Sequence, residues 1–182
     1  MAKYFIDCGA HDGCSVRYFR LTEPRAHDYI VHSFEPNPMF WDKLRQVPQI
    51  MFHPEAVWIE DCDKQFYLSG ASAHDGSTLI ASKTTGKVDR DNPITVRCIN
   101  FSRWMQDNLR SSDYVILKLD IEGAEYDVLQ RMLDDGSISI VKKLYIEFHQ
   151  KKIGLPKQAH DQLVLKLRSV GLAPHAWDAL GH

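Results

Sequence analysis

The sequence predicts one α/β domain in which a mostly parallel sheet carries helices on both faces. Runs that favour strands alternate with runs that favour helices along most of the 182 residues. Several strand runs are apolar throughout, as expected of strands that are buried on both faces of a parallel sheet. The length suits one well-packed core and is short for two ordinary domains. We therefore expect residues 1–182 to form a single domain.

The first third of the chain alternates between strands and helices. The β-rich run "KYFIDCG" ends at a glycine, and "SVRYFRL" after it has helical spacing. A second strand is expected in "DYIVHSFEPN". Asn37 can then cap a helix that has Pro38 at its first position. The run "IMFHPEAVW" predicts a third strand.

The sequence pattern changes between residues 64 and 99. The short β runs "KQFYLSG", "STLIAS" and "ITVRCIN" stand between turns rich in Gly, Ser, Asp and Asn. We interpret this segment as a small antiparallel insertion rather than as a separate domain.

The remaining chain returns to alternation. "FSRWMQDNL" predicts a helix, "YVILKLDI" a buried strand, and "AEYDVLQRML" a helix that closes near Gly136. "SIVKKLYIEFH" predicts another strand. A helix in "PKQAHDQLVLKLRSVGL" is followed by Gly171 and Pro174, which are typical of a helix end, and "APHAWDAL" predicts a last strand.

Every main strand of this predicted sheet finishes on an acid. In open α/β sheets, ligands bind outside the carboxyl ends of the strands. The sequence therefore predicts a site at that edge. The residues at the strand ends are Asp7 with Gly9, Glu35, Glu55, Asp120 with Glu122, and Glu147 with His149.

Composition narrows the classes of partner. The net charge is −2 and no Lys/Arg run occurs, so we expect no nucleic-acid partner. No apolar run is long enough to span a bilayer, and the N-terminus enters a strand without signal-peptide features, which predicts a cytoplasmic protein. The four cysteines form no C-x-x-C pair and are expected to be free thiols.

The first two strand ends suggest a nucleoside. In "DCGAHDG", Gly9 and Gly13 permit a tight turn, and Glu35, at the second strand end, can accept hydrogen bonds from both ribose hydroxyls. The spacing is not the dinucleotide G-x-G-x-x-G, and Asp7 and Asp12 crowd carboxylates where a pyrophosphate would sit. S-adenosylmethionine, with its sulfonium and amine, suits this loop better. A capped turn and a solvated acid are the alternative.

Specific segments resemble the FkbM family of S-adenosylmethionine-dependent methyltransferases. They are "FIDCGAHDGCSVRYF", "VHSFEPNP", "HPEAVW" with "FYLSG", "GSTL", and "LKLDIEGAEYDVL" with "YIEFH", and together they span about residues 4 to 149. The resemblance implies a Rossmann-like class I methyltransferase fold and methyl transfer to oxygen, often on a sugar or secondary metabolite. The chain departs from the family near "APHAWDALGH", where the usual final β-hairpin is short or incomplete. The insertion at residues 64–99 is compact and is expected to form part of the acceptor pocket.

The resemblance also implies roles for individual residues. It places Asp7, Gly9 and Gly13 at the amino-acid end of the cofactor and Glu35 at its ribose. The segment around Glu55 and Ala56 is implied near the adenine, and Asp120 at the reacting centre. The expected cofactor-binding set is completed by Ala10 and His11 in the glycine loop and by Pro36 after Glu35.

Acids and a histidine at the fourth and fifth strand ends are the catalytic candidates. Asp120 is expected to contact cofactor or acceptor, and His149 has the most suitable unperturbed pKa for a base near neutrality. Glu147 is expected to orient His149 or to bind acceptor hydroxyls. Lys118, two residues before Asp120, points to the same side of the strand and can neutralise the cluster. Glu125 is interpreted as a charge that complements the helix dipole.

Two alternatives stay open at this level. Asp120, Glu122, Glu147 and His149 carry ligand types that suit Mg²⁺ or Mn²⁺, but their spacing matches no known metal motif and we expect no metal. A nucleotide-cofactor oxidoreductase or epimerase, or a cofactor-binding module without catalysis, competes with the methyltransferase reading. The expected partner is a small-molecule or glycan acceptor, and the sequence leaves the oligomeric state open.

Overall fold

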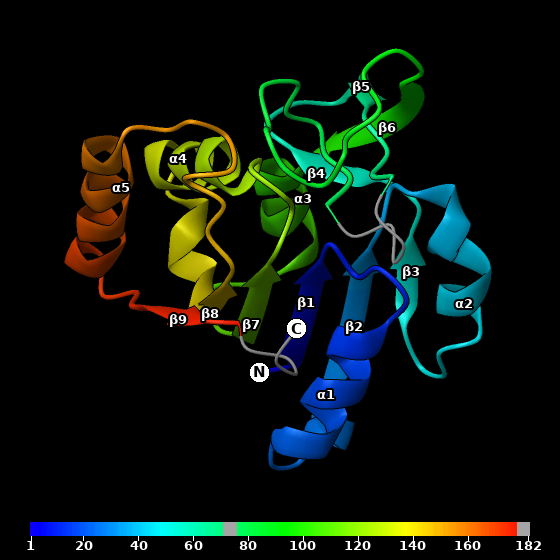
Figure 1. Ribbon diagram of the computed structural model, residues 1–182. Coiled ribbons are helices and arrows are strands. Elements are labelled where there is room, and N and C mark those ends of the chain that lie inside the picture. The colour runs from blue at the N-terminus through cyan, green and yellow to red at the C-terminus, as the bar shows by residue number, and fades with distance from the viewer. Residues whose placement is uncertain (71–75, 178–182) are drawn as a thin grey trace.

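The computed structural model describes residues 1–70 and 76–177 (Figure 1). Its main sheet has six strands in the order β3-β2-β1-β7-β8-β9, and all of the strand pairs in it are parallel. These strands are β1 (Lys3–Cys8), β2 (Tyr29–Phe34), β3 (Met51–His53), β7 (Tyr114–Leu119), β8 (Val141–Ile146) and β9 (Pro174–Ala176). The parallel α/β architecture predicted from the sequence is confirmed.

Helices connect the strands and cover both faces of the sheet. The α-helices are α1 (Cys14–Thr22), α2 (Trp41–Arg45), α3 (Phe101–Asn108), α4 (Glu125–Asp134) and α5 (Lys157–Ser169). Short 3₁₀ helices occupy Ala26–Asp28, Pro38–Phe40 and Ser137–Ile140. The Asn37 side chain accepts a hydrogen bond from the Met39 N–H at 3.1 Å, which confirms its role as a cap.

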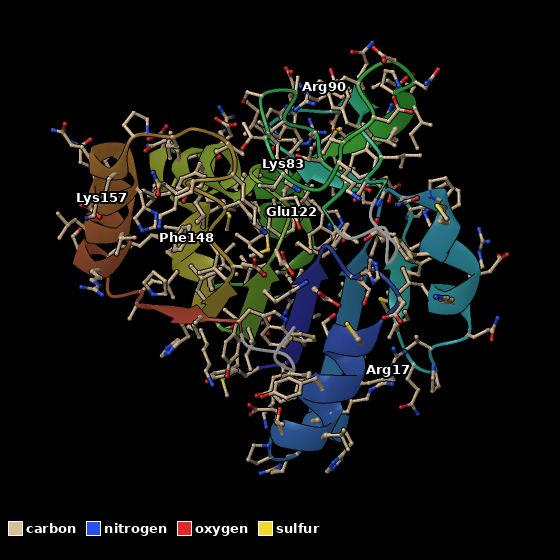
Figure 2. The ribbon with its side chains drawn as sticks, in the orientation of Figure 1. Arg17, Lys83, Arg90, Glu122, Phe148 and Lys157 are labelled. Carbon is tan, nitrogen blue, oxygen red and sulfur yellow. The ribbon has the colours of Figure 1, made fainter. Side chains whose placement is uncertain are left out.

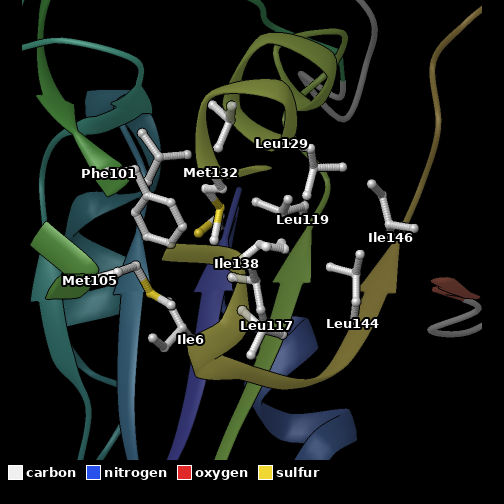
Figure 3. Packing of buried hydrophobic residues seen from close by; sticks show 14 of the residues in the cluster. Ile6, Phe101, Met105, Leu117, Leu119, Leu129, Met132, Ile138, Leu144 and Ile146 are labelled. Carbon is white, nitrogen blue, oxygen red and sulfur yellow. The ribbon is translucent and has the colours of Figure 1, made fainter. Parts of the chain in front are cut away.

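The larger core lies between the sheet and helices α3, α4 and α5. Leu117 and Leu119 of β7 pack there with Phe101 of α3 and with Leu129 and Met132 of α4 (Figure 3). The opposite face is covered by α1. On that face, the rings of Phe5 from β1 and Phe19 from α1 stack in parallel with their centroids 4.0 Å apart. Burial on both faces explains why these strands are apolar throughout.

Strand alternation also buries a charged pair. Asp7 of β1 and Lys118 of β7 are register partners, and both are buried. Since side chains two residues apart share a face, Asp7 lies on the same face as Phe5, beneath α1. A carboxylate and an ammonium group therefore stand side by side directly below the glycine loop.

A second, three-stranded sheet lies over the carboxyl ends of β1, β2 and β7 (Figure 1). It contains β4 (Ala56–Trp58), β5 (Cys62–Phe66) and β6 (Ile94–Asn100), in the order β4-β6-β5. The β5–β6 pair is antiparallel, as expected of the insertion, whereas β4 runs parallel to β6.

Two strand predictions in this region were wrong in detail. The run "IMFHPEAVW" is not one strand, because the chain leaves the main sheet after His53 and enters the small sheet at Ala56. Pro54 lies at the break and lacks the N–H that a continued ladder would need. The run "STLIAS" forms an isolated bridge between Thr78 and Tyr67 rather than a strand. The ladder does not continue because the Ile80 N–H donates to the Thr78 hydroxyl instead of to a neighbouring strand.

The last described strand forms one edge of the main sheet. Strand β9 follows α5 and pairs in parallel with β8, in the region where "APHAWDAL" predicted a strand; residues 178–180 of that run lie outside the described part. Across residues 1–70 and 76–177, the helices are all too short or too polar to cross a membrane.

Candidate functional site

A cavity of about 460 Å³ lies at the carboxyl ends of the central strands, between the main sheet and the small sheet. Most residues that the sequence predicted for the site line it: Gly9, His11, Glu35, Pro36, Glu55, Ala56, Lys118, Asp120 and Glu147. Phe66, from β5 of the small sheet, and Ser77 and Leu79, from the loop between β5 and β6, also line the wall. Four predicted residues, Asp7, Ala10, Gly13 and His149, lie behind the walls instead.

The glycine loop joins the ends of β1 and β7 closely. Gly9 has a φ of +81°, and a Cβ built on it would lie 1.9 Å from the Asp120 carbonyl oxygen. Only glycine tolerates both the left-handed backbone and this approach. Ala10 is fully buried against Phe40 and Leu44 and therefore shapes the loop from behind.

Gly13 also supports the loop from outside the cavity. It precedes α1 with a φ of +84°, and a Cβ there would come within 2.8 Å of a Val47 methyl group. The residue is thus required for the start of α1 to pack against the chain after α2.

Glu35 is held at the end of β2 by two backbone donors. Its Oε2 accepts the His11 N–H and its Oε1 accepts the Asn37 N–H, each at 2.8 Å. Burial raises the pKa of this carboxyl to about 7, while the two N–H groups and Lys118 act in the opposite direction. Each carboxylate oxygen has two acceptor sites, so a further donor in the cavity can bind the same oxygens.

Lys118 is committed to contacts with its neighbours. Its Nζ donates to the Gly9 carbonyl at 2.7 Å and lies 3.2 Å from Asp7 Oδ1 and 3.6 Å from Asp120 Oδ2. Although burial disfavours its charge, Asp7 and Asp120 raise the pKa of Lys118 above its ordinary value. The ammonium therefore stays charged and positions the strand ends, which agrees with the neutralising role expected from the sequence.

Four carboxylates surround the imidazole of His149, which is 1 % exposed. Its Nε2 lies 3.2 Å from Glu147 Oε1, 3.3 Å from Glu122 Oε2 and 3.7 Å from Asp120 Oδ1. On the other side of the ring, Nδ1 lies 3.2 Å from Glu125 Oε1. The structure thus brings together the acids and the histidine that the sequence placed at one sheet edge.

Electrostatics distinguish the members of this cluster. Despite its burial, the carboxylates of Glu125 and Glu147 next to the ring raise the pKa of His149 to about 10. The same contact with His149 lowers the pKa of Glu147 to about 2. Burial raises the pKa of Asp120, with Lys118 opposing it. A histidine that keeps its proton at neutral pH is a weaker candidate for a base than the sequence suggested, and Asp120 is a stronger one.

Sequence reasoning missed several polar groups of the site. Asn37 was recognised as a cap, but it also lines the cavity, where its buried Nδ2 has no hydrogen-bond partner within the described chain. Ser15, on the first turn of α1, donates its hydroxyl proton to Asp7. The signal for Ser15 in the sequence is its position at a helix start, two residues after Gly13. The signal for Asn37 is its position two residues after Glu35.

Lys83 gave no signal in the sequence. It lies in a polar loop of the insertion, yet it is 1 % exposed, and its Nζ lies 2.5 Å from Glu122 Oε2 and 2.5 Å from the Gly76 carbonyl (Figure 2). Lys152 also lines the cavity, 3.4 Å from Glu147 Oε1. Lys83 reaches Glu122 from a segment that is distant in sequence, whereas Lys152 follows Glu147 closely in the chain.

Comparisons with known proteins identify the family of the chain. The model of the methyltransferase FkbM domain matches residues 7–172. The protein "Methyltransferase 1" of Beauveria bassiana (strain ARSEF 2860) is 26 % identical over 171 residues, which cover 82 % of this chain and 66 % of that protein. The chain thus spans just under two thirds of that relative's length. No solved structure is significantly similar to this chain. The chain belongs to the FkbM methyltransferase family.

Proposed function

We propose that the chain is an S-adenosylmethionine-dependent methyltransferase that methylates a hydroxyl oxygen of a sugar or another small metabolite. Membership of the family supports methyl transfer. The observation that carries the cofactor assignment is the Glu35 carboxylate, held by two backbone N–H groups on the cavity wall at the end of β2.

The donor set around the cavity fits this cofactor. A ribose presents two hydroxyl donors, and Glu35 offers carboxylate oxygens with acceptor sites to spare. Asn37 adds a buried amide donor that lacks a partner among the described residues. The methionine end carries an ammonium and a sulfonium, and Asp120 is a carboxylate on the same wall, beside the glycine loop. Acidic side chains thus stand where a cationic group would be held.

The protein's part in the reaction is to bind and align. When bound, S-adenosylmethionine supplies a methyl group that is activated by its sulfonium. Alignment of an acceptor with such a group can contribute about 7–11 kcal/mol to lowering the barrier. Asp120 is the candidate to take the acceptor's proton, since it lines the cavity and burial raises its pKa.

The far side of the cavity suits a polar acceptor of modest size. Glu147 and Lys152 supply charged groups to its wall, whereas Phe66 and Leu79 supply apolar surface. Hydroxyl groups can donate to the carboxylate and accept from the ammonium, and the carbon skeleton can contact the apolar side chains. A sugar or a hydroxylated metabolite has this mixture of surfaces.

The first test is a calorimetric titration with S-adenosylhomocysteine beside NAD. We expect S-adenosylhomocysteine to bind, and Glu35→Ala to weaken the binding tenfold or more, which corresponds to about 1.4 kcal/mol. Glu60→Ala is the matched control, because Glu60 is an exposed acid in the turn after β4 and does not line the cavity. No binding, or a preference for NAD, contradicts the cofactor assignment.

The second test concerns the acceptor. The protein is incubated with S-adenosylmethionine carrying a labelled methyl group and with a panel of sugars and hydroxylated metabolites, and transfer is followed by mass spectrometry. Label on an acceptor oxygen supports the proposal. Tight S-adenosylhomocysteine binding with no transfer to any acceptor would instead support a cofactor-binding module without catalysis.

A further inference from the structure

We propose that Asp120, Glu122 and His149, with Glu147 beside them, form a binding site for a hard divalent cation such as Mn²⁺ or Mg²⁺. The site shares Asp120 with the proposed methyl-donor and acceptor contacts and adds Glu122 and His149, which those contacts do not use. Its occupancy can be measured with no cofactor present. Asp120, Glu122 and Glu147 line the cavity, so a cation held by them is accessible to oxygen atoms of a bound acceptor.

The spacing of the ligand atoms fits one ion. One oxygen of Asp120, one of Glu122 and a nitrogen of His149 all lie within 4.8 Å of one another. In octahedral coordination with bonds of about 2.1 Å, adjacent ligand atoms are about 3 Å apart. The Nε2 of His149 lies 3.2 Å from Glu147 Oε1, 3.3 Å from Glu122 Oε2 and 3.7 Å from Asp120 Oδ1. These separations need little adjustment around an ion.

The imidazole of His149 gives independent evidence for a ligand. Its side chain is fully buried, and its Nε2 has no hydrogen-bond partner with correct geometry within the described residues, although three carboxylates surround it. The ring nitrogen is therefore aimed at none of these oxygens individually. A buried nitrogen in this position is explained by an atom bound between the carboxylates.

Glu125 orients the ring for that purpose. Its Oε1 accepts the backbone N–H of His149 at 2.8 Å and lies 3.2 Å from Nδ1. A proton on Nδ1 then points to Glu125, and the Nε2 lone pair faces the cluster. Metal-binding histidines usually donate their other ring N–H to a carboxylate in this way, which fixes the orientation of the ring.

The backbone at Glu122 is strained in a way that serves the cluster. Glu122 has a φ of +56°, which is the left-handed region that a residue with a long side chain rarely adopts. Its carbonyl accepts the Thr78 hydroxyl at 2.7 Å, which holds the turn in place. Strain of this kind persists where the surrounding structure enforces it, and it is common at ligand-binding sites.

Charge compensation favours a divalent ion. When His149 is neutral, the five carboxylates in and around the cluster carry two more charges than the three ammonium groups beside them. One divalent cation would balance this difference. The carboxylates are Asp7, Asp120, Glu122, Glu125 and Glu147, and the ammonium groups are Lys83, Lys118 and Lys152. A proton on His149 is the other way to offset part of this charge, so proton and cation are alternative occupants.

The sequence pattern predicted no metal, because the ligands are arranged by the sheet rather than by one motif. Asp120 and Glu122 follow β7, and Glu147 and His149 follow β8. The parallel β7–β8 pairing brings these two ends together across 25 or more residues of chain. Carboxylate-rich sites with one imidazole suit Mn²⁺ and Mg²⁺ better than the softer cations, which prefer sulfur ligands.

The experiment uses Mn²⁺ as the probe on the full chain without cofactor. Free Mn²⁺ is quantified by electron paramagnetic resonance during a titration, and a pulsed measurement detects coupling to the nitrogen of a directly bound imidazole. We expect one saturable site that shows this coupling and is competed by Mg²⁺. Glu122→Gln and His149→Gln are expected to weaken binding tenfold or more, and His149→Gln to abolish the coupling.

Controls separate binding from folding. Asp107→Asn, at an exposed acid on α3, is expected to bind Mn²⁺ like the wild type. Circular dichroism reports whether each variant is folded, and the nitrogen coupling in the wild type tests the site without any variant. A lack of saturable binding, or Mn²⁺ bound without imidazole coupling, overturns the proposal. Neither result bears on S-adenosylhomocysteine binding, which is measured separately.

Discussion

Glu125 and His149 are joined by one carboxylate oxygen, which accepts the backbone N–H of His149 at 2.8 Å and lies 3.2 Å from its Nδ1. The other oxygen of Glu125 accepts the Gly123 N–H at 2.8 Å. Both side chains are buried. The start of α4 is thereby fixed to the segment after β8, at the floor of the candidate site.

Glu125→Gln is expected to destabilise the protein by about 1–3 kcal/mol. The amide presents one oxygen, so its NH₂ group faces either the Gly123 or the His149 N–H, and one buried donor loses its acceptor. Urea denaturation measures the loss. Asp127→Asn is the control, because Asp127 lies in the same helical turn but is exposed. Equal losses in the two variants would contradict the assigned contact.

Two glycine-to-alanine variants separate steric conflict from backbone strain. Gly9 and Gly136 both have a positive φ, of +81° and +77°. At Gly136, no atom of the described chain lies within 4 Å of an added Cβ, so Gly136→Ala should cost about 1–2 kcal/mol through strain alone. At Gly9 the added Cβ meets the Asp120 carbonyl oxygen, so Gly9→Ala should cost at least 3 kcal/mol, on the order of a severe core defect.

Thermal and urea unfolding of both glycine variants provide the measurement. A Gly9→Ala protein that unfolds like Gly136→Ala would show that β1 and β7 can separate at the loop without penalty. The close approach of Gly9 to Asp120 would then not be a requirement of the fold.

The buried Lys118–Asp7 pair is expected to be strongly coupled. Lys118→Met leaves the Asp7 carboxylate buried without its ammonium partner, which should cost about 3–5 kcal/mol. The double variant with Asp7→Asn removes both charges and should be less destabilised than the sum of the single variants. The surface pair Lys3–Asp28 has the same 3.2 Å separation and should show a much smaller coupling in its own cycle. Additive effects at Lys118 and Asp7 would refute the coupling.

The carboxyl edge was predictable because local patterns set it. Parallel strands end at the same edge of a sheet, so the acids that follow each strand can be assigned to that edge from the sequence. Side chains alternate along a strand with a period of two, so Lys118 can be assigned to the same side as Asp120. The role of Glu125 was not predictable. The sequence indicates only a charge that complements the helix dipole, and the tertiary fold shows that Glu125 binds a residue 24 positions later.

The insertion was foreseen as β-rich, but not its path. The division of "IMFHPEAVW" between two sheets depends on where β6 lies, and the β6 residues that pair with β4 are 42 positions further along the chain, as Ala56 and Cys98 show. The buried ammonium of Lys83 contacts the Glu122 carboxylate and the Gly76 carbonyl. Gly76 is close to Lys83 in the sequence, but Glu122 is far from it. Contacts of this kind leave no periodic signal in the residues themselves.

Glu35 makes stability depend on pH in a predictable direction. Burial raises its pKa from an ordinary 4.5 to about 7 in the folded protein. Between these two values the folded state holds a proton that the unfolded state has lost, so the associated stability is present at low pH and is lost as the pH rises through 7. From pH 5 to pH 8 the free energy of unfolding should fall by about 2 kcal/mol because of this group. Glu35→Gln does not ionise and should lack this component.

The measurement is a set of urea unfolding curves at pH 5, 6, 7 and 8 for the wild type and for Glu35→Gln. Other titrating groups, including the lowered-pKa pair His32 and His53, contribute to both proteins and cancel in the comparison. The gap between the two proteins should therefore change by about 2 kcal/mol in favour of the variant as the pH rises. Parallel pH profiles would show that the Glu35 carboxyl ionises as readily in the folded protein as in the unfolded chain, and that its burial at the end of β2 does not disfavour its charge.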